Sequence, residues 1–511
     1  MLKKIRVLLA VFFMASITLL FLDYTGSVHA YIGWSARVQL VPAILAVNAA
    51  VFIGLILITA LFGRLYCSTI CPLGLFQDAV SRIAGIRKKN RFSYRPQHRA
   101  AAVLRFALLG IFALAVIVPV SAIPVLLEPY SAYGRIASEI FGPLYQLGNN
   151  VLAWLAERAE SYAFYSVDVW LRSMGVFAAA VLTVLVVGIF AWRSGRGYCN
   201  SVCPVGAFLG FLAQYSLVKL RIDKEKCTAC GACARVCKAA CIDTSGKEID
   251  YLRCVACFNC MGSCPQKALT YSTPAIMKGA HTMKTSEPHL REKADALPKD
   301  GAARRGILAG IAFFTLGFVT RAAARVYEFD GGLAPLQKKK APLRASPILP
   351  PGADTLRNFQ KSCTGCQLCV SVCQNQVLRS SIGAPLFMQP SLSFERGYCR
   401  PECVRCSGVC PNGALRPVTP AEKSATQIGY AVWIKDNCVV NTDNVACDLC
   451  ERKCPTGAIT RIPQRAGDPS SPKIPMIDTN RCIGCGSCEH LCPARPYSAL
   501  YVEGIDTHRT I

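Results

Sequence analysis

The chain has 511 residues, enough for several domains, with 52% hydrophobic residues, 29 cysteines and a formal net charge of +26. The positive charge alone is compatible with nucleic-acid binding, but no recognition motif accompanies it, and a basic stretch, residues 86–99, lies between two apolar segments. Lysine and arginine in such a loop set the orientation of a membrane protein. We therefore predict a membrane protein and no nucleic-acid partner.

Four apolar segments in the first half of the chain approach the length that crosses a bilayer, about 20 residues. The loops after the second and fourth segments are basic, whereas the loop after the third carries five acidic residues. The positive-inside rule therefore places the N-terminus, the basic loop and the residues after Trp192 in the cytoplasm. Residues 1–205 are predicted to form an α-helical membrane domain with four spans: Val7–Leu22, Leu40–Phe62, Phe106–Leu127 and Met174–Trp192.

Two C-x3-C-P motifs follow the second and fourth spans, with cysteines at Cys67, Cys71, Cys199 and Cys203. A spacing of four positions places both thiols of a motif on one face of a helix. Two such pairs would close around one iron–sulfur cluster or metal ion, and the residue types do not identify which. Free thiols or disulfides are the alternatives, although a cytoplasmic location disfavours disulfides. We predict a metal centre at the membrane edge.

Residues 206–272 contain two C-x2-C-x2-C-x3-C runs, the pattern of a two-cluster ferredoxin. In this pattern three closely spaced thiolates bind one face of a cluster, and the fourth comes from the other run. Structural zinc is the alternative, but zinc ligands usually come as separated pairs. Cys241 is left over and is expected to pack rather than bind. The predicted ligands of two [4Fe–4S] clusters are Cys227, Cys230, Cys233 and Cys264, and then Cys254, Cys257, Cys260 and Cys237.

Three segments connect this cytoplasmic domain to the rest of the chain. Residues 273–303 are predicted to be a polar linker, and residues 326–359 an extended tether, because the latter are rich in proline and lysine. Between them, residues 304–325 carry twin arginines before a short apolar run, the pattern of an export leader. A short buried helix is the alternative, but we predict a fifth span, lengthened by flanking arginines that reach the interface. An odd number of spans would carry residues 360–511 to the periplasm.

The C-terminal block, residues 360–511, contains four further cysteine groups and is predicted to hold four more [4Fe–4S] clusters in a double ferredoxin unit. The groups could pair in sequence, or in a nested order with the first joined to the fourth and the second to the third. The nested order is preferred because the two regular groups are the outer ones, and because related four-cluster subunits, which this block resembles, also nest. The predicted sets are Cys363, Cys366, Cys369 with Cys492; Cys482, Cys485, Cys488 with Cys373; Cys399, Cys403, Cys406 with Cys454; and Cys438, Cys447, Cys450 with Cys410.

Other cofactors leave no signal in the sequence. There is no C-x-x-C-H motif for a c-type haem, none of the six histidines lies within a predicted span, and no glycine-rich nucleotide loop indicates a flavin. His490, beside Cys488, is expected to pack near a cluster rather than bind it. Six predicted clusters, a candidate seventh centre and no evident substrate-converting site favour an electron carrier. The predicted fold class is an α-helical membrane domain with α+β ferredoxin-like domains.

The C-x3-C-P pairs, followed by a two-cluster ferredoxin, resemble the NapH-type membrane ferredoxins of periplasmic nitrate reductase systems. From Arg304 onward the chain resembles the NapG/MauM family, through the twin arginines, the LPPGA sequence at residues 349–353 and the C-x8-C-x2-C-x3-C-P pattern at Cys438–Pro455. The second cysteine group departs from NapG-like proteins, which usually have a longer middle gap. The resemblance implies a fusion of the two types in a bacterial inner membrane. It further implies quinol oxidation, as a quinol dehydrogenase component, and electron delivery to a periplasmic reductase or cytochrome acceptor.

A second class of function is a metal-reducing or oxidase assembly factor. FixG-type maturation proteins share the C-x3-C-P pairs and a two-cluster ferredoxin. They lack a second, four-cluster block, so residues 360–500 favour quinol-linked electron transfer.

Candidate quinol-site residues end the third span at the outer interface: Glu128, Tyr130, Tyr133 and Arg135. Quinol oxidation needs a proton acceptor, and a carboxylate at a membrane boundary can serve. Ordinary interfacial anchoring by tyrosine and arginine is the alternative. No cofactor ligand is evident at the midplane of the bilayer, so the sequence does not show how electrons cross it.

Overall fold

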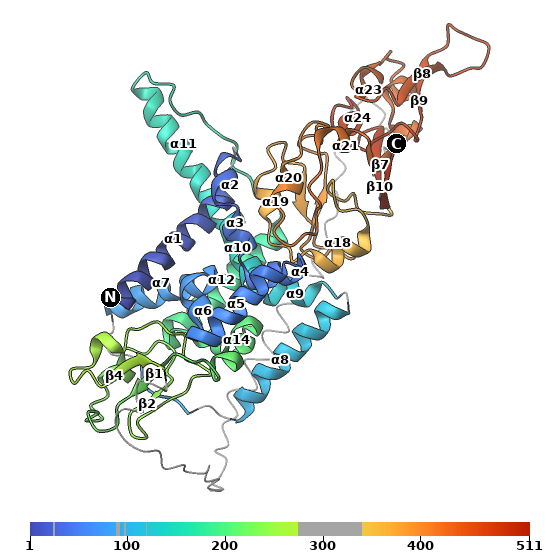
Figure 1. Ribbon diagram of the computed structural model, residues 1–511. Helices are drawn as coiled ribbons and strands as arrows, with labels where there is room; N and C mark the ends of the chain where they lie inside the picture. Colours follow the sequence, from blue (N-terminus) through green and yellow to red (C-terminus); the bar gives the residue numbers. More distant parts are fainter. Residues whose placement is uncertain (24–25, 88–91, 97–98, 119, 274–339) are drawn as a thin grey trace, which may run out of the picture. The chain divides into compact units, whose positions relative to one another are not determined.

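The computed structural model describes residues 1–23, 26–87, 92–96, 99–118, 120–273 and 340–511. All of them belong to one unit, formed by Met1–Ile276 with Lys340–Ile511. This unit combines apolar helices from the first half of the chain with cysteine-rich domains that contain small two-stranded sheets (Figure 1). The predicted fifth span, residues 304–325, lies outside the described residues, as do nearly all of the predicted linker and the first part of the predicted tether.

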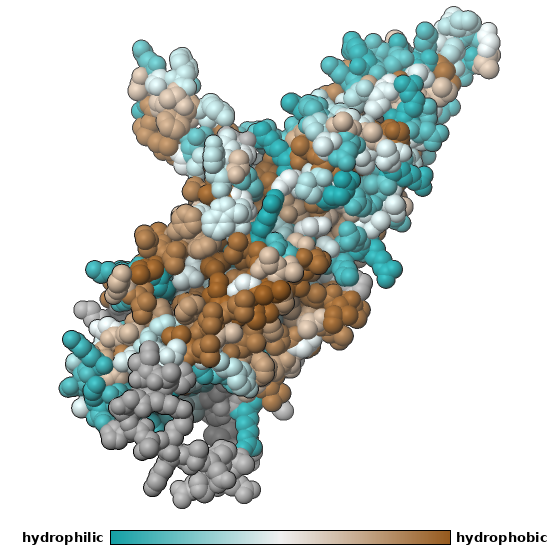
Figure 2. Space-filling model, viewed as in Figure 1, coloured by the Kyte–Doolittle hydropathy of each residue, from teal (hydrophilic) through white to brown (hydrophobic). Residues whose placement is uncertain are grey.

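Three described helices are long and apolar enough to cross a membrane: α1 (Leu2–Leu22), α8 (Arg99–Ile117) and α12 (Met174–Ser194). Two shorter apolar helices accompany them, α5 (Ala49–Phe62) and α14 (Pro204–Ala213). Hydrophobic residues gather on the surface over the helices of the first half of the chain, and hydrophilic residues over the C-terminal domain (Figure 2). An apolar surface of this extent is typical of a face covered by lipid or by a partner.

The predicted second and third spans are each interrupted, so their boundaries are wrong. Between α4 (Leu40–Leu45) and α5, the side chain of Asn48 accepts a backbone hydrogen bond at 3.2 Å and caps a new helix. Helix α8 ends at Ile117, two positions before Pro119, and α9 (Ala122–Leu127) is a separate helix. Apolar composition does not reveal such breaks, because they depend on one capping residue or one proline.

A buried helical segment follows α9. Every residue of α10 (Pro129–Ile136) is buried, and Glu128 caps this helix by accepting hydrogen bonds from two backbone N–H groups of its first turn. The chain continues through a π-helix, η1 (Ala137–Phe141), into α11 (Gly142–Arg158). Because π-helical turns are rare and frequently occur at functional sites, η1 is a candidate functional feature.

The first half of the chain also contains α7 (Pro72–Arg87) and four short helices: α2 (Ser27–Ile32), α3 (Trp34–Arg37), α6 (Leu65–Thr69) and α13 (Gly197–Ser201). The first ferredoxin domain then contains two antiparallel strand pairs. Strand β1 (Lys219–Ile222) pairs with β4 (Leu269–Ser272), and β2 (Ile242–Asp243) pairs with β3 (Glu248–Ile249). The cysteine loops lie between these strands, together with α15 (Ala232–Arg235) and a 3-10 turn, η2 (Met261–Ser263).

The C-terminal domain contains three antiparallel strand pairs: β5 (Leu378–Ser380) with β6 (Pro390–Leu392), β7 (Thr426–Trp433) with β10 (Leu500–Thr510), and β8 (Ile459–Pro463) with β9 (Lys473–Ile477). Its short helices are α18 (Leu356–Ser362), α19 (Leu368–Ser371), α20 (Arg405–Gly408), α21 (Pro420–Ser424), η4 (Lys435–Asn437), α22 (Val439–Thr442), α23 (Leu449–Arg452) and α24 (Ser487–His490). Many of these helices carry cysteines, so the secondary structure serves mainly to present thiols.

The described part of the predicted tether, residues 340–359, is packed against this domain, so the extended-tether prediction is wrong there. Ile348, Leu349 and Ala353 are buried in the core that also contains Val502 of β10. Proline and lysine composition favours an extended chain, but burial of these apolar side chains outweighs it.

The two ferredoxin regions contact opposite ends of α12. A side chain at Gly175, near its first residue, would come within 2.6 Å of Ile382 in the C-terminal domain. A side chain at Gly195, just after its last residue, would come within 2.6 Å of the backbone oxygen of Lys238 in the first ferredoxin domain. A helical rise of 1.5 Å per residue separates these contacts by about 30 Å, close to the hydrocarbon thickness of a bilayer.

Candidate iron–sulfur centres

The first ferredoxin domain brings its eight predicted ligands together in the two predicted sets. The first set lines one small cavity: Cys227, Cys230, Cys233 and Cys264. The second set surrounds Cys260, whose thiol pKa is raised by burial and then by the charges of Cys257 and Cys254. Cys237 contributes to the same rise in pKa. Cys241, left over in the sequence, is buried with its Sγ 3.5 Å from the Sγ of Cys237.

In the C-terminal domain the cysteine groups pair in sequence, and the nested assignment is wrong. Cys373 lies with the second group. Burial raises the pKa of the Cys406 thiol, and the charges of the nearby Cys399 and Cys373 raise it further. Helix α19 packs against α20, and α23 against α24, so consecutive groups share a unit. Elements that follow one another in the chain usually lie side by side. The observed sets are Cys363, Cys366, Cys369 with Cys410; Cys399, Cys403, Cys406 with Cys373; Cys438, Cys447, Cys450 with Cys492; and Cys482, Cys485, Cys488 with Cys454.

These four sets lie in a series. The first adjoins the membrane domain, where a side chain at Gly134 would collide with the backbone oxygen of Cys366. The second and fourth are joined by a hydrogen bond of 2.9 Å from Cys399 N to Cys485 O. The domain therefore offers a series of cluster sites that starts beside the apolar helices of the first half of the chain.

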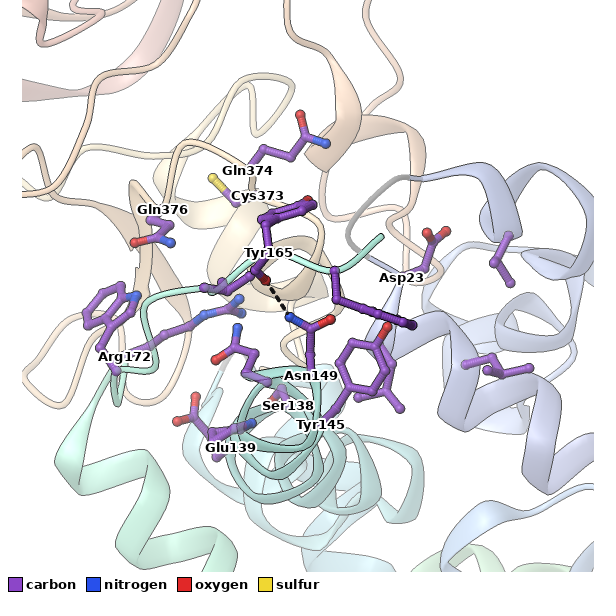
Figure 3. Close-up of a pocket in the computed structure, with 18 of the residues that line it drawn as sticks. Asp23, Ser138, Glu139, Tyr145, Asn149, Tyr165, Arg172, Cys373, Gln374 and Gln376 are labelled. Atoms are coloured by element: carbon purple, nitrogen blue, oxygen red, sulfur yellow. Dashed lines mark hydrogen bonds between the residues drawn. The ribbon is translucent and has the colours of Figure 1, made fainter. Parts of the chain in front are cut away.

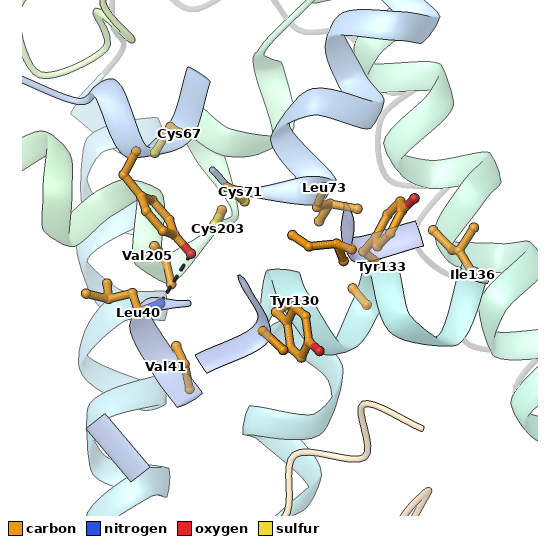
Figure 4. Packing of buried hydrophobic residues seen from close by; sticks show 14 of the residues in the cluster. Leu40, Val41, Cys67, Cys71, Leu73, Tyr130, Tyr133, Ile136, Cys203 and Val205 are labelled. Carbon is orange, nitrogen blue, oxygen red and sulfur yellow. Dashed lines mark hydrogen bonds between the residues drawn. The ribbon is translucent and has the colours of Figure 1, made fainter. Parts of the chain in front are cut away.

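The membrane-edge thiols of Cys67, Cys71, Cys199 and Cys203 are all buried and free of disulfides. Figure 4 shows Cys67, Cys71 and Cys203 gathered among the packed hydrophobic side chains. Burial raises the pKa of the Cys71 thiol, and the charges of Cys199, Cys67 and Cys203 raise it further. The thiols of the two motifs therefore lie close together.

The two thiols of a motif do not share a helical face, which corrects the helix argument. Cys67 lies in α6, whereas Cys71 follows the end of that helix and directly precedes Pro72, the first residue of α7. A residue before proline avoids the helical conformation, so the chain bends between the two thiols. The same break separates Cys199 in α13 from Cys203, which caps α14.

Buried arginines surround these thiols, and sequence reasoning missed them. Arg64 donates to Leu252 O at 3.0 Å and lies 3.8 Å from the Sγ of Cys67. Arg196 donates to the backbone oxygen of Cys67 at 2.7 Å and pairs with Asp78 at 2.9 Å. The sequence did contain a pattern that could have identified these arginines. Each cysteine motif is part of a longer repeat, G-R-x-Y-C-x3-C-P-x-G, in which an arginine precedes the first cysteine by three positions.

The repeat also explains two glycines. A side chain at Gly74 would come within 2.5 Å of the Arg196 guanidinium, and one at Gly206 within 3.0 Å of the Arg64 guanidinium. Each arginine therefore crosses to the other copy of the repeat and packs on its glycine. This exchange holds the two cysteine pairs together.

The donor set at the membrane edge fits an anionic iron–sulfur cluster. Four thiolates on a [4Fe–4S] core leave a net negative charge, and a buried charge must be compensated by opposite charge and hydrogen bonds. Arg64, Arg196 and Gln77 Nε2, which lies 3.1 Å from the Sγ of Cys199, supply these donors. Within the described ranges, no group of three or more His, Cys, Asp or Glu side chains is arranged to hold a single metal ion.

The four predicted quinol-site residues are buried rather than placed at an exposed interface. Glu128 caps α10, and Arg135 donates to the backbone oxygen of Val125 at 2.6 Å. The hydroxyl of Tyr133 lies 2.6 Å from Thr18 Oγ1, and the ring of Tyr130 packs on α1. Each side chain therefore has a structural contact, and a role in quinol binding stays a prediction. His490 contacts the backbone oxygen of Phe394 through Nδ1 at 3.0 Å.

Family models identify the cofactor class. Models described as "4Fe-4S binding domain" match residues 45–91 with 175–224 and, separately, residues 220–243. A model described as "4Fe-4S dicluster domain" matches residues 445–495. The first match contains all four membrane-edge cysteines, and the last joins the third and fourth cysteine groups of the C-terminal domain. These matches, together with the cysteine sets, show that the protein binds [4Fe–4S] clusters.

Curated relatives identify the family. The methylamine utilization ferredoxin-type protein MauM of Methylobacillus flagellatus is 32% identical over 165 residues, which cover 32% of this chain and 70% of MauM. The ferredoxin-type protein NapG of Escherichia coli is 31% identical over 179 residues, which cover 32% of this chain and 75% of NapG. The chain belongs to the NapG/MauM family of ferredoxin-type proteins.

Membership makes this NapG/MauM-family chain an iron–sulfur electron-transfer protein of the ferredoxin type. A further relative, the ferredoxin-type protein NapF of Escherichia coli, is 28% identical over 156 residues, 30% of this chain and 86% of NapF. The alignments with MauM and NapG each cover about a third of the chain. No solved structure matches the chain.

Proposed function

We propose that this protein is a membrane-anchored electron carrier that takes electrons from quinol and passes them to a periplasmic reductase or cytochrome. It would combine a NapH-like membrane ferredoxin with the NapG/MauM-type domain in one chain. The membrane-edge cysteines, matched by a 4Fe-4S binding domain, would hold a seventh cluster beside six in the two ferredoxin regions.

The observation that carries this proposal is a continuous buried core that joins cysteines of all three regions. This core contains Cys67, Cys71 and Cys203 of the membrane edge, and both Cys257 of the first ferredoxin domain and Cys366 of the C-terminal domain pack against it. Cluster sites connected through packed protein, with no water between them, are suited to electron transfer. The sequence showed no ligands between the two sides, and the shared core supports a path between them.

Contacts on α12 support an arrangement with one ferredoxin region on each side of the membrane. The first domain touches the end of α12 that carries Arg193 and is followed by Arg196, the predicted cytoplasmic side. The C-terminal domain touches the other end, the predicted periplasmic side. The path through Cys71 would then carry electrons across the bilayer.

The residues of the chain prepare this path electrostatically. A [4Fe–4S] cluster supplies reversible one-electron chemistry when bound, and its potential depends on nearby charge, hydrogen bonds and exposure. Arg64 and Arg196 lie in the buried core and would favour the reduced, more negative form of the membrane-edge centre. Buried packing around the thiols would exclude water and protect the centre.

Reduction of the purified full-length protein by menadiol tests this proposal. We expect menadiol to bleach the iron–sulfur absorbance, and titration to show seven clusters, or about 28 iron atoms per chain. Oxidised clusters after prolonged exposure to menadiol, in protein that dithionite reduces fully, would overturn quinol oxidation. That result would favour the FixG-like alternative, a metal-reducing or assembly factor.

A further inference from the structure

A large cavity lies where the π-helix η1, helix α11 and the C-terminal domain meet. Its volume is about 550 Å³, within the range of about 300–1,000 Å³ that is common for small-molecule sites. The walls come from the end of α1, from η1 and α11, from the loop before α12, and from residues 373–376. Figure 3 shows Glu139 and Arg172 on one side, Tyr145 and Asp23 toward the other, and Cys373 at the edge.

Two charged side chains in this cavity each have one buried atom without a hydrogen-bond partner among the described residues. Glu139 is 1% exposed, and its Oε1 has no hydrogen-bond partner among the described residues. Arg172 has a buried Nη1 that is equally without a partner in the described part of the chain. An unpaired buried polar atom costs free energy, so a pair of them facing one cavity indicates a polar ligand.

The remaining walls suit an aromatic ring with an apolar tail. Tyr145, Tyr165 and Trp170 provide aromatic surface, and the Trp170 ring is held between Arg379 and Arg396, 4.8 and 4.3 Å from its centroid. Leu19 and Leu22 of α1 also line the cavity, so one wall belongs to a helix apolar enough to cross a membrane.

Cys373 connects the cavity to the electron path. It lines the cavity and belongs to the cysteine set of Cys399, Cys403 and Cys406. A ligand bound here would adjoin a cluster site without an intervening domain. None of the four residues that the sequence singled out for quinol lines this cavity.

We propose that this cavity binds the headgroup of a quinol, with Glu139 accepting its hydroxyl proton and Arg172 holding its second oxygen. The inference rests on the proposed function, because it supplies the site for that electron donor. Two O–H bonds of the quinol break and two carbonyl bonds form. Two electrons leave, one at a time, for the oxidised [4Fe–4S] site at Cys373, the first moving on along the series before the second follows. Two protons leave in turn through the Glu139 carboxylate to water.

The environment of Glu139 agrees with this role. Burial raises the pKa of Glu139 to about 7, although the charge of Arg172 opposes the rise. A general base is most effective when its pKa lies near the working pH. Glu139 also lies in the π-helix η1, a kind of turn that is rare and frequent at functional sites.

Photolabelling of the full-length protein tests the site without relying on its activity. A short-chain azidonaphthoquinone should label peptides containing residues 138–149 and 163–172, and excess menadione should suppress this labelling. Labelling confined to other peptides would overturn the assignment. Ala163→Trp, at an exposed position of the cavity wall, should reduce labelling at least tenfold without disturbing the buried charges.

Kinetics separate failure of the site from failure of the proposed function. Glu139→Gln should slow reduction by menadiol at least tenfold while dithionite still reduces every cluster, and the exposed Glu157→Gln in the same segment should behave as wild type. If menadiol does not reduce the wild-type protein, the proposed function fails. If it does, and Glu139→Gln and Ala163→Trp react at the wild-type rate, quinol is oxidised elsewhere and the site assignment fails.

Discussion

Residues 220–272 and residues 340–511 both bring a cysteine set to the apolar helices of the first half of the chain, but through different contacts. The first region is held by charged side chains: Arg64 and Arg105 both donate to Leu252 O, at 3.0 and 3.1 Å. The C-terminal region is held by small residues in close approach, with Ser131 Oγ donating to Thr364 Oγ1 at 2.7 Å. Arginines next to an anionic cluster adjust its charge, whereas close packing fixes distance. The two interfaces should therefore respond to different substitutions.

Loss of the centre between the two regions should have the largest effect. Cys67→Ala removes one of four thiols and should lower the iron content by one cluster, about four atoms per chain. Electron transfer between the two ferredoxin regions should stop, because the proposed path runs through this centre. Iron analysis and rapid-mixing absorbance measure both effects. Ser68→Ala is the matched control, a buried position between the two thiols of the same motif, and an equal loss of iron in both variants would contradict the assignment.

Packing at the C-terminal interface should tolerate no added volume. In Gly134→Ala the new methyl group would overlap Cys366 O and approach Phe21 to 2.8 Å. We expect a loss of about 1–3 kcal/mol in the free energy of unfolding, measured as a lower Tm. Gly148→Ala in α11 meets nothing within 4 Å and should be neutral or stabilising. Equal Tm values for the two variants would show that the regions do not meet as described.

Removal of a charge at the interface with residues 220–272 should change the reduction potential of the membrane-edge centre more than it changes the stability of the protein. Arg64→Met removes a buried positive charge near Cys67, so the reduction potential of the membrane-edge centre should fall by tens of millivolts. Arg64→Lys keeps the charge and should recover most of the difference. Redox titration followed by electron paramagnetic resonance measures the shift. A potential that does not change in Arg64→Met would mean that the guanidinium acts only as a structural donor.

Acid should weaken the C-terminal region by a small amount through His508. Burial lowers the pKa of His508 to about 4, against a slight rise from Asp354. Its folded-state pKa lies below the unfolded value of 6.5, so the unfolded state binds the extra proton and stability falls as pH drops from about 6.5 to 4. With partial exposure of the ring, the loss should be on the order of 1–2 kcal/mol.

Comparison with a variant isolates this contribution. His508→Gln should flatten the pH dependence of Tm for the C-terminal region over the same range. Residues 220–272 contain no histidine and cannot show this effect. An unchanged pH profile in the variant would exclude His508 as its source.

Short cysteine spacings predicted the ligand sets of the first ferredoxin domain more accurately than the length of apolar segments predicted the helix boundaries. The sets around Cys227 and Cys260 follow from the C-x2-C-x2-C-x3-C runs, because a few residues can place three thiols in only a few ways. The boundaries of the second and third spans did not follow, because the cap at Asn48 and the end of α8 at Ile117 interrupt apolar segments that look continuous. The pairing in the C-terminal domain was also wrong, because the lengthened gaps before Cys403 and Cys447 describe individual loops and not which groups share a unit.

The sequence by itself determined the cofactor class, the family and the presence of helices apolar enough to cross a membrane, since ligand type and hydropathy are local properties. Only the tertiary structure decided which fourth cysteine completes each set of the C-terminal domain, that Arg64 and Arg196 surround the membrane-edge thiols, and that Glu139, Arg172 and Cys373 share one cavity. These residues are far apart in the chain, and their proximity depends on how helices pack. A sequence pattern therefore indicates which cofactor a segment can bind, whereas tertiary packing decides which segments contribute ligands to the same site.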